Sequence, residues 1–206
     1  MRIGSTIPIA SSFVAAVIDR VSRQYPRISF QVVAIQTETL HRELLERNVD
    51  FLIARRFGPE IDERLHFETL YNDPYVVAAG LQNPLLRRRK LRLPDLVNEA
   101  WALPPPDSLV GSFVTKAFRA SGLEFPTATV VTFPFAVRTT LVAAGRFLTV
   151  LPQSLLTLPA KHSFIKPLRV ALPIESGPIG IFTVETRSLS SAAQMFIEHA
   201  REIAKA

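Results

Sequence analysis

The chain has 206 residues, of which 48% are hydrophobic and 20% are charged, so it can bury a substantial core as one domain or two small ones and is not disordered. It has no cysteine, which excludes disulfides, cysteine-bound zinc, iron–sulfur clusters and thiol nucleophiles. Its formal net charge of +6 favours contact with anionic partners such as nucleic acid.

The densest basic segment, Arg87-Arg88-Arg89-Lys90-Leu91-Arg92, lies between Pro84 and Pro94. It has no interleaved aromatic residue, so it indicates either a solvated surface segment or a patch that faces phosphate groups. No apolar stretch approaches the roughly 18 residues of a membrane span, and no signal peptide follows Arg2. We therefore expect a cytoplasmic protein without membrane contact.

The first third of the chain alternates strands and helices. A short strand at 2–5 precedes an amphipathic helix at 11–25, which Pro26 ends. A buried strand at 30–35, a helix at 37–47 with Thr37 as N-cap, and an apolar strand at 50–54 follow. This βαβαβ pattern predicts parallel strands with right-handed crossovers and helices on both faces of the sheet.

Two extended segments, 66–71 and 75–79, come next and are interrupted by Asp73-Pro74. Asn83-Pro84 and the basic segment mark a boundary or linker. A second α/β unit is then expected, with a short helix start at 93–97, a strand at 101–103, a helix at 110–120, a strand at 127–132, a helix at 135–144 closed by Gly145, strands at 147–151 and 179–185, and a helix at 190–204. The paired extended segments and the strand at 179–185 are candidates to cross between the two halves.

Patterns of catalytic chemistry are missing from the sequence. Gly111-Ser112 lacks the second glycine of a Gly-x-Ser-x-Gly elbow, and neither a Walker loop nor Gly-x-Gly-x-x-Gly is present. The histidines His41, His66, His162 and His199 are not spaced as ligands on one helix face, which favours surface histidines over a metal site. The sequence therefore predicts no enzyme activity, no cofactor and no metal.

Polar residues, prolines and phenylalanines follow the predicted strands instead. In open α/β sheets, ligands bind at the carboxyl ends of the strands, where helix N-termini offer free N–H groups. Hydroxyls and amides would hold a ligand's polar groups, an arginine would pair with a carboxylate, and phenylalanine and proline would contact its apolar face. The candidate ligand-binding residues are Ser5, Thr6, Ile7, Pro8, Gln36, Thr37, Arg55, Pro105, Pro106, Ser108, Phe133 and Phe135.

Each candidate also has a structural interpretation. Thr37 is first an N-cap, and the hydroxyls of Ser5 and Thr6 can satisfy loop backbone. Phe133 and Phe135 can belong to the core, and one of Arg55 and Arg56 can be solvated. The triple proline at 104–106 is stiff, and stiffness alone can explain it.

Several short motifs occur in a distinctive order. They are Arg2-Ile3-Gly4, Tyr25-Pro26, Thr37 with Leu40, Leu44 and Leu45, Asp50-Phe51-Leu52-Ile53-Ala54, Leu70-Tyr71, Asn83-Pro84-Leu85, Leu141-Val142-Ala143-Ala144-Gly145 and Leu151-Pro152. Their order and spacing resemble the effector-binding domain of LysR-type transcriptional regulators over essentially the whole chain. The segments 101–106 and 189–194 resemble the branch related to regulators of sugar-binding-protein genes.

The resemblance implies an α/β fold of two Rossmann-like subdomains joined by two crossover strands, similar to type 2 periplasmic binding proteins. It implies a first subdomain at 1–73 plus 180–206, a second at 74–179, and an effector in the cleft between them. It also implies a homodimer, a tetramer in the full-length regulator, and DNA contact through an N-terminal winged helix-turn-helix domain. That domain is absent, so we expect a fragment or a truncated product. Arg146-Phe147 departs from the acidic or small residues usual after Gly145.

We therefore expect an effector-sensing domain that binds a sugar, an aromatic acid or another small carboxylate and couples this binding to DNA. A periplasmic-type solute-binding protein of a transporter would share the fold and is the main alternative, although the missing signal peptide argues against it. An enzyme on this fold, with prephenate dehydratase-like or deaminase-like activity, is a third interpretation, which the lack of an acid–base or cofactor site disfavours.

Overall fold

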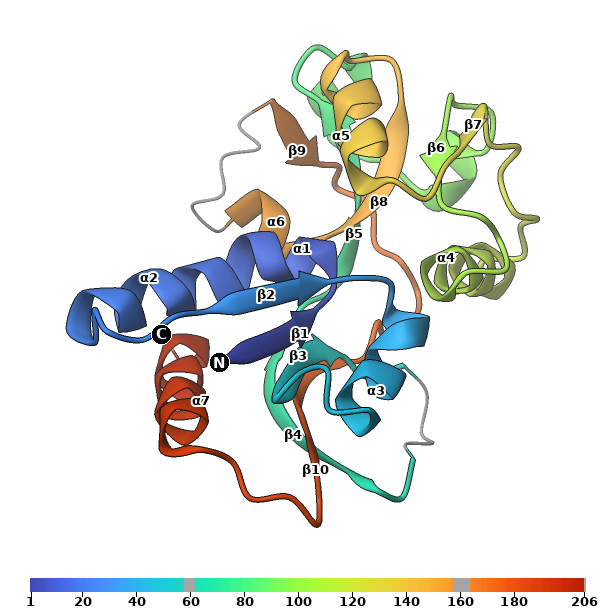
Figure 1. Cartoon of the computed structure of the whole chain (residues 1–206). Coiled ribbons are helices and arrows are strands. Elements are labelled where there is room, and N and C mark those ends of the chain that lie inside the picture. The colour runs from blue at the N-terminus through green and yellow to red at the C-terminus, as the bar shows by residue number, and fades with distance from the viewer. Residues whose placement is uncertain (58–61, 158–163, 206) are drawn as a thin grey trace. The chain divides into compact units, whose positions relative to one another are not determined.

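A computed structural model describes residues 1–57, 62–157 and 164–205, without the side chains of Thr37 and Glu38. The chain divides into two compact units, which are described separately (Figure 1). Unit 1 comprises Met1–Asp73 and Gly177–Ala206, and unit 2 comprises Pro74–Ser176. The chain returns to unit 1 at Gly177, before the expected boundary at 180, because the last strand already pairs with Asn72 at Pro178.

Unit 1 contains a five-stranded sheet in the order β2-β1-β3-β10-β4. β1 (Arg2–Ser5) pairs in parallel with β2 (Gln31–Ala34) and with β3 (Phe51–Arg55), which confirms the predicted parallel strands. β10 (Pro178–Val184) is antiparallel to β3 and to β4 (Leu65–Asn72).

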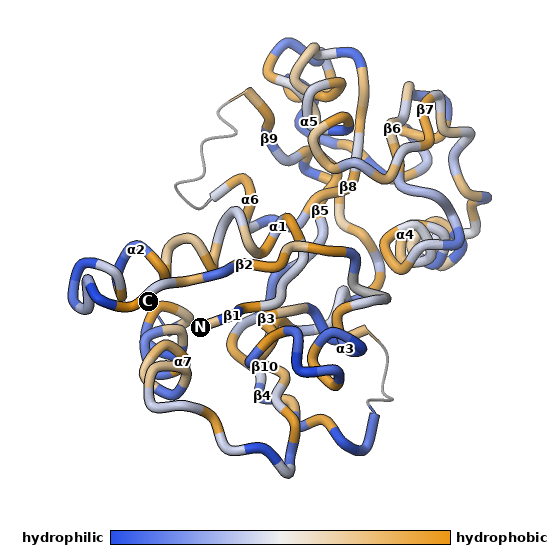
Figure 2. The backbone as a smooth tube through the Cα atoms, in the orientation of Figure 1, coloured by the Kyte–Doolittle hydropathy of each residue, from blue (hydrophilic) through white to orange (hydrophobic). Residues whose placement is uncertain are grey.

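Helices cover both faces of this sheet, as the apolar strand at 50–54 predicts. Phe51 and Ile53 of β3 pack with α2 (Ala15–Gln24) and α7 (Ser191–Ala204), whereas Leu52 and Ala54 pack with α3 (Thr37–Leu45). The alternation follows from the two-residue period of a strand. Figure 2 shows the matching change between hydrophobic and hydrophilic positions along α2 and α7.

The first helix begins earlier than predicted. Instead of starting at 11, it runs without a break through α1 (Ile7–Ile9), the π-helical segment η1 (Ala10–Val14) and α2. Pro8 does not stop it, because a proline in the first turn lacks an N–H that would have no partner there anyway. Ser11 and Ser12 donate hydrogen bonds from Oγ to the carbonyl of Pro8, at 3.1 and 2.8 Å, so they lie inside the helix and do not cap it.

The second helix is shorter than the predicted 37–47. Gln36, and not Thr37, occupies the N-cap position of α3. The helix ends at Leu45, because Arg47 adopts a left-handed backbone conformation with φ of 65° that a helix cannot continue through.

Unit 2 is built around the antiparallel sheet β8-β5-β9, formed by β8 (Leu148–Pro152), β5 (Tyr75–Gly80) and β9 (Ile165–Pro167). β6 (Ala102–Leu103) pairs in parallel with β7 (Val130–Val131), and a parallel bridge from Trp101 to Leu148 places β6 beside β8. The expected strand at 127–132 is therefore much shorter than predicted, since only two of its residues find a partner strand. β9 was not predicted.

The helices of unit 2 are α4 (Leu109–Ala120), α5 (Phe135–Ala143) and the short α6 (Ser154–Thr157), with 3-10 turns at η2 (Pro84–Arg87) and η3 (Leu93–Leu96). Gly145 closes α5 as predicted: its φ is 93°, and its N–H donates to the carbonyl of Val142 at 2.9 Å. Within the described ranges, no helix is both long and apolar enough to cross a membrane.

Candidate functional site

The carboxyl ends of three parallel strands meet at one edge of unit 1. Ser5, the last residue of β1, lies opposite Ala34 of β2 and Ile53 of β3. α1 begins directly after β1, and α3 begins shortly after β2, on the side to which the arrows of these strands point (Figure 1). Two helix N-termini therefore meet at this edge, and each brings backbone N–H groups without intrahelical partners and a partial positive charge.

The predicted residues at this edge have different roles. Thr6 and Gln36 occupy the N-cap positions of α1 and α3, and neither side chain caps its helix. Ser5 is fully buried and donates its Oγ hydrogen bond to the carbonyl of Ile53 at 2.7 Å, which matches the structural interpretation. Ile7 is 47% exposed and lines a surface groove beside α2 and β2. The side chain of Thr37 lies outside the described part of the structure.

Arg55, at the end of β3, contacts the two residues of unit 1 at which the chain leaves this unit and returns to it. Its guanidinium is 3% exposed. Nη2 lies 3.4 Å from Oδ2 of Asp73, and Nη1 donates a 2.6 Å hydrogen bond to the carbonyl of Gly177. Asp73 is the last residue before the chain leaves unit 1, and Gly177 is the first after it returns. This placement fits a structural role for Arg55. No local sequence pattern indicates either partner, and in the sequence Asp73 stands out only as an interruption between two extended segments.

Tyr71 lies beside this ion pair in β4. Its ring packs against Phe13 with centroids 4.8 Å apart. Burial, and next the carboxylate of Asp73, raise the pKa of the Tyr71 hydroxyl, whereas Arg55 lowers it. The phenol is therefore neutral at physiological pH and contributes apolar packing under the first helix.

An equivalent edge exists in unit 2. Leu103 of β6 lies opposite Val131 of β7 in a parallel pair, so the segments that follow both strands leave from the same edge. α4 and α5 begin after these segments. Unit 2 thus presents its own pair of helix N-termini, at the places where the sequence predicts ligand contacts.

The proline segment is tied to the start of α4. Ser108 caps this helix: its Oγ accepts from the N–H of Gly111 at 3.0 Å and donates to the carbonyl of Pro105 at 2.6 Å. A Cβ atom on Gly111 would lie 1.9 Å from the Pro105 carbonyl oxygen, so only glycine permits this close approach. Ser108 is buried, Pro105 is half-buried and Pro106 is exposed. Ser108 therefore shapes the segment, and Pro106 forms its outer surface.

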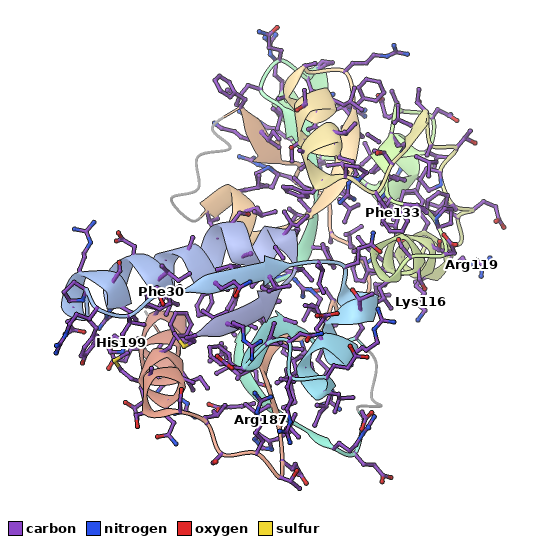
Figure 3. The ribbon with its side chains drawn as sticks, in the orientation of Figure 1. Phe30, Lys116, Arg119, Phe133, Arg187 and His199 are labelled. Carbon is purple, nitrogen blue, oxygen red and sulfur yellow. The ribbon has the colours of Figure 1, made fainter. Side chains whose placement is uncertain are left out.

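The two candidate phenylalanines differ in exposure. Phe135 is 9% exposed and packs in a core with Val142 and Leu151. Phe133 is 46% exposed and belongs to the segment between β7 and α5, where Figure 3 labels it. The core interpretation thus describes Phe135, whereas Phe133 offers an apolar face at the edge of unit 2.

Arg138 is a buried residue of α5 that was not predicted as a site residue. Phe135, Arg138, Thr139 and Val142 form the buried stripe of α5, and Arg138 is 7% exposed. Among the described residues, neither its Nε nor its Nη1 has a hydrogen-bond partner. Burial lowers the pKa of the Arg138 guanidinium, and Tyr75 opposes this effect. An arginine at helical spacing within an apolar stripe is the sequence signal that could have revealed it.

The described part of the chain holds no group of three or more histidine, cysteine, aspartate or glutamate residues able to bind a metal ion. His41 is half-buried against the ring of Phe182, at 4.8 Å, and this burial lowers its pKa. His199 is bound through Nδ1 to the carbonyl of Met195 and through Nε2 to Gln24. His162 falls outside the described residues.

Comparison with known proteins identifies the family. The family model described as the LysR substrate binding domain matches residues 1–205. The chain belongs to this family. It is 27% identical over 197 residues to the HTH-type transcriptional regulator GbpR of Azospirillum brasilense, covering 94% of the chain and 57% of the relative. It is 31% identical over 127 residues to GbpR of Rhizobium radiobacter, covering 60% of the chain and 41% of that relative.

Solved structures share the fold. The regulatory domain of CcmR from Synechocystis PCC6803, in complex with 2-PG, matches with a TM-score of 0.83 at 19% identity, covering 100% of this chain and 97% of that one. The BenM effector binding domain with benzoate has a TM-score of 0.79 at 22% identity, covering 100% and 91%. Both solved structures are regulatory or effector-binding domains with the type 2 periplasmic-binding-protein-like fold. Their likeness to this chain confirms the predicted fold class.

The family and its relatives also decide between the functional alternatives. The relatives are transcriptional regulators, so the family match favours a sensing domain over the solute-binding protein of a transporter. The family is one of effector-binding domains and not of enzymes, which confirms that prediction. The chain spans 57% of the length of the Azospirillum relative.

Proposed function

We propose that this chain is the effector-sensing domain of a LysR-type transcriptional regulator and binds one small organic effector at the strand-end loops of its units. The family match over residues 1–205 carries this proposal. The structure supports it within each unit, because two helix N-termini lie at the carboxyl edge of parallel strands in both.

The candidate residues divide into those that contact the effector and those that stabilise the loops around it. In the proposed complex, backbone N–H groups at Ile7 and in the first turn of α3 bind polar groups of the effector, together with the side chains of Thr6 and Gln36. Phe133 and Pro106 contact its apolar face, because both are exposed beside helix N-termini. Ser5, Ser108 and Arg55 act as supports, since each is buried and hydrogen-bonded within its own unit.

A small carboxylate is the proposed effector class. Two solved relatives of the same fold are described in complex with shikimate and with benzoate, both of which are carboxylates. Free N–H groups at helix N-termini suit an anion better than a neutral sugar, because the helix dipole adds a favourable charge interaction.

Effector binding would act on DNA through a helix-turn-helix domain of the full-length regulator, in the cytoplasm. An effector shifts a conformational equilibrium only by its difference in affinity for the two states, and a change from 1:99 to 99:1 needs about 5.5 kcal/mol. A ligand that binds one conformation of the domain more tightly than another can supply such a difference.

A second copy of this chain is the proposed partner of unit 1. β2 is an edge strand of the five-stranded sheet, and beside it lies a groove of about 610 Å³ lined by α1, η1, α2 and β2. Ile7 and Val32 are 47% and 39% exposed in this groove. Unpaired edge strands with apolar neighbours favour association. Light scattering should give a dimer for the wild type and a monomer for Val32→Glu; a dimeric variant would refute this interface.

A thermal-shift screen tests effector binding. Shikimate, benzoate and glucose are added to the wild type, to Phe133→Ala and to Phe164→Ala. Phe164 is a matched control, because it is also an exposed phenylalanine of unit 2, at 66%. We expect a carboxylate to raise the melting temperature of the wild type and of Phe164→Ala. Its dissociation constant should rise about fivefold in Phe133→Ala, since a lost aromatic contact costs about 1 kcal/mol. Equal binding by both variants would place the effector elsewhere.

A further inference from the structure

The described part of unit 2 leaves two donors of the buried Arg138 guanidinium unpaired. Arg138 is 7% exposed, and its Nε and Nη1 donors have no hydrogen-bond partner among the described residues. Arg55, also a buried arginine, has Asp73 and the Gly177 carbonyl as partners. Buried donors without partners, on a charge that no carboxylate among the described residues pairs, lower the stability of a fold, so their presence indicates a role other than stability.

The helix geometry directs Arg138 toward the strand-end edge of unit 2. Arg138 is the fourth residue of α5, and its N–H donates to the carbonyl of Pro134. Side chains of an α-helix tilt toward its N-terminus, so the guanidinium lies back over the first turn. Its central carbon is 5.8 Å from the ring centroid of Phe135, which agrees with this direction.

The groups around the guanidinium come from the same edge. Tyr75 is the first residue of β5 and lies opposite Pro152, the last residue of β8. Because β8 runs parallel to β6 at the Trp101–Leu148 bridge, the start of β5 lies at the edge where β6 and β7 end. Tyr75 packs on Phe113 of α4, with ring centroids 4.8 Å apart. The Phe135 ring therefore lies beside Arg138, and Tyr75, which acts electrostatically on the guanidinium, stands at the edge where the loops of the proposed site begin.

We propose that Arg138 binds the anionic group of the effector, a carboxylate or a phosphate, at the N-terminus of α5. The proposal rests on the proposed function and names the residue that selects anions. A guanidinium offers parallel N–H donors to two oxygens of either group, and the partial positive charge of the helix N-terminus adds to the attraction. Arg138 is 7% exposed, and this low exposure to water strengthens the charge interaction.

Isothermal titration of the purified domain tests this role. The probes are benzoate and methyl phosphate as anions, with benzamide and glucose as uncharged comparisons. The variants are Arg138→Met, Arg138→Lys and Arg119→Met, the last as a control that removes the same charge from an exposed position on α4. We expect at least one anion to bind the wild type and Arg119→Met equally, and its dissociation constant to rise about 10- to 100-fold in Arg138→Met.

Arg138→Lys should lose less affinity, because lysine keeps the charge but not the paired donors. If only benzoate depends on Arg138, the anion is a carboxylate; if only methyl phosphate does, it is a phosphate. The melting temperature of ligand-free Arg138→Met should equal or exceed that of the wild type, since a buried charge that no described carboxylate pairs is removed. A lower melting temperature would show a structural role and overturn the proposal.

Other outcomes separate this inference from the proposed function. Equal anion affinity in the wild type and Arg138→Met would overturn the role of Arg138 and leave the sensing function standing. Binding of benzamide or glucose, but of neither anion, would do the same. Failure of every probe to bind the wild type would count against the sensing function, and against this inference with it.

Discussion

The ion pair between Arg55 and Asp73 allows a quantitative prediction. The two charged side chains are 3% and 2% exposed, and Nη2 lies 3.4 Å from Oδ2. At an effective dielectric constant of about 20, two unit charges at this distance attract each other by about 5 kcal/mol. Removing one partner of such a buried pair typically costs about 3–5 kcal/mol, because the other charge stays buried without compensation.

We therefore expect Asp73→Asn to lower the free energy of unfolding by about 3 kcal/mol, at the low end of that range, because asparagine can still accept a hydrogen bond from Arg55. The matched control is Glu68→Gln. Glu68 also pairs with an arginine, Arg201 of α7, at 2.7 Å, but the two side chains are 35% and 45% exposed. Solvent screens such a pair, so its loss should cost less than about 1 kcal/mol.

Urea unfolding followed by circular dichroism measures both variants. The double variant Arg55→Met/Asp73→Leu adds a second test, since replacing a whole buried pair with apolar residues should recover most of the stability lost in Asp73→Asn. If Asp73→Asn costs no more than Glu68→Gln, the pair contributes little and Arg55 does not hold the crossover segments by its charge.

Two further predictions concern Gly177 and the loss of stability at low pH. Gly177→Ala should lower the free energy of unfolding, measured in urea, by more than Gly122→Ala does. Both glycines have left-handed backbones, with φ of 74° and 70°. A Cβ atom at Gly177 would lie 2.2 Å from the Arg56 carbonyl oxygen, whereas no atom lies within 4 Å of a Cβ atom at Gly122. Each alanine variant gains about 1–2 kcal/mol of backbone strain, so only the difference between the two losses of unfolding free energy reports the steric overlap at Gly177. Equal losses would refute this overlap. The hydrogen bond from Arg201 lowers the pKa of Glu68, so its contribution to stability is present above the unfolded-state pKa of about 4.3 and is lost as the pH falls through the lower folded value. The free energy of unfolding should therefore decrease less between pH 7 and pH 3 for Glu68→Gln than for the wild type. An equal decrease in both proteins would contradict a stabilising role for the Glu68–Arg201 hydrogen bond.

The sequence by itself determined the local architecture. The spacing of apolar residues predicted the parallel strands β1, β2 and β3 and the helices on both faces of their sheet, because these features depend on period and burial within short segments. Gly145 predicted the end of α5 for the same reason, since a left-handed backbone at a helix end requires glycine most often.

Only the tertiary structure decided the roles of the charged residues. Arg55 meets Gly177, which is 122 positions away in the sequence, and no local pattern encodes that hydrogen bond. Arg138 occupies a position that periodicity alone would give to an apolar residue, and its burial depends on the sheet beneath α5. The energy of a charge is set by the groups that surround it in space, and these come from segments distant in sequence.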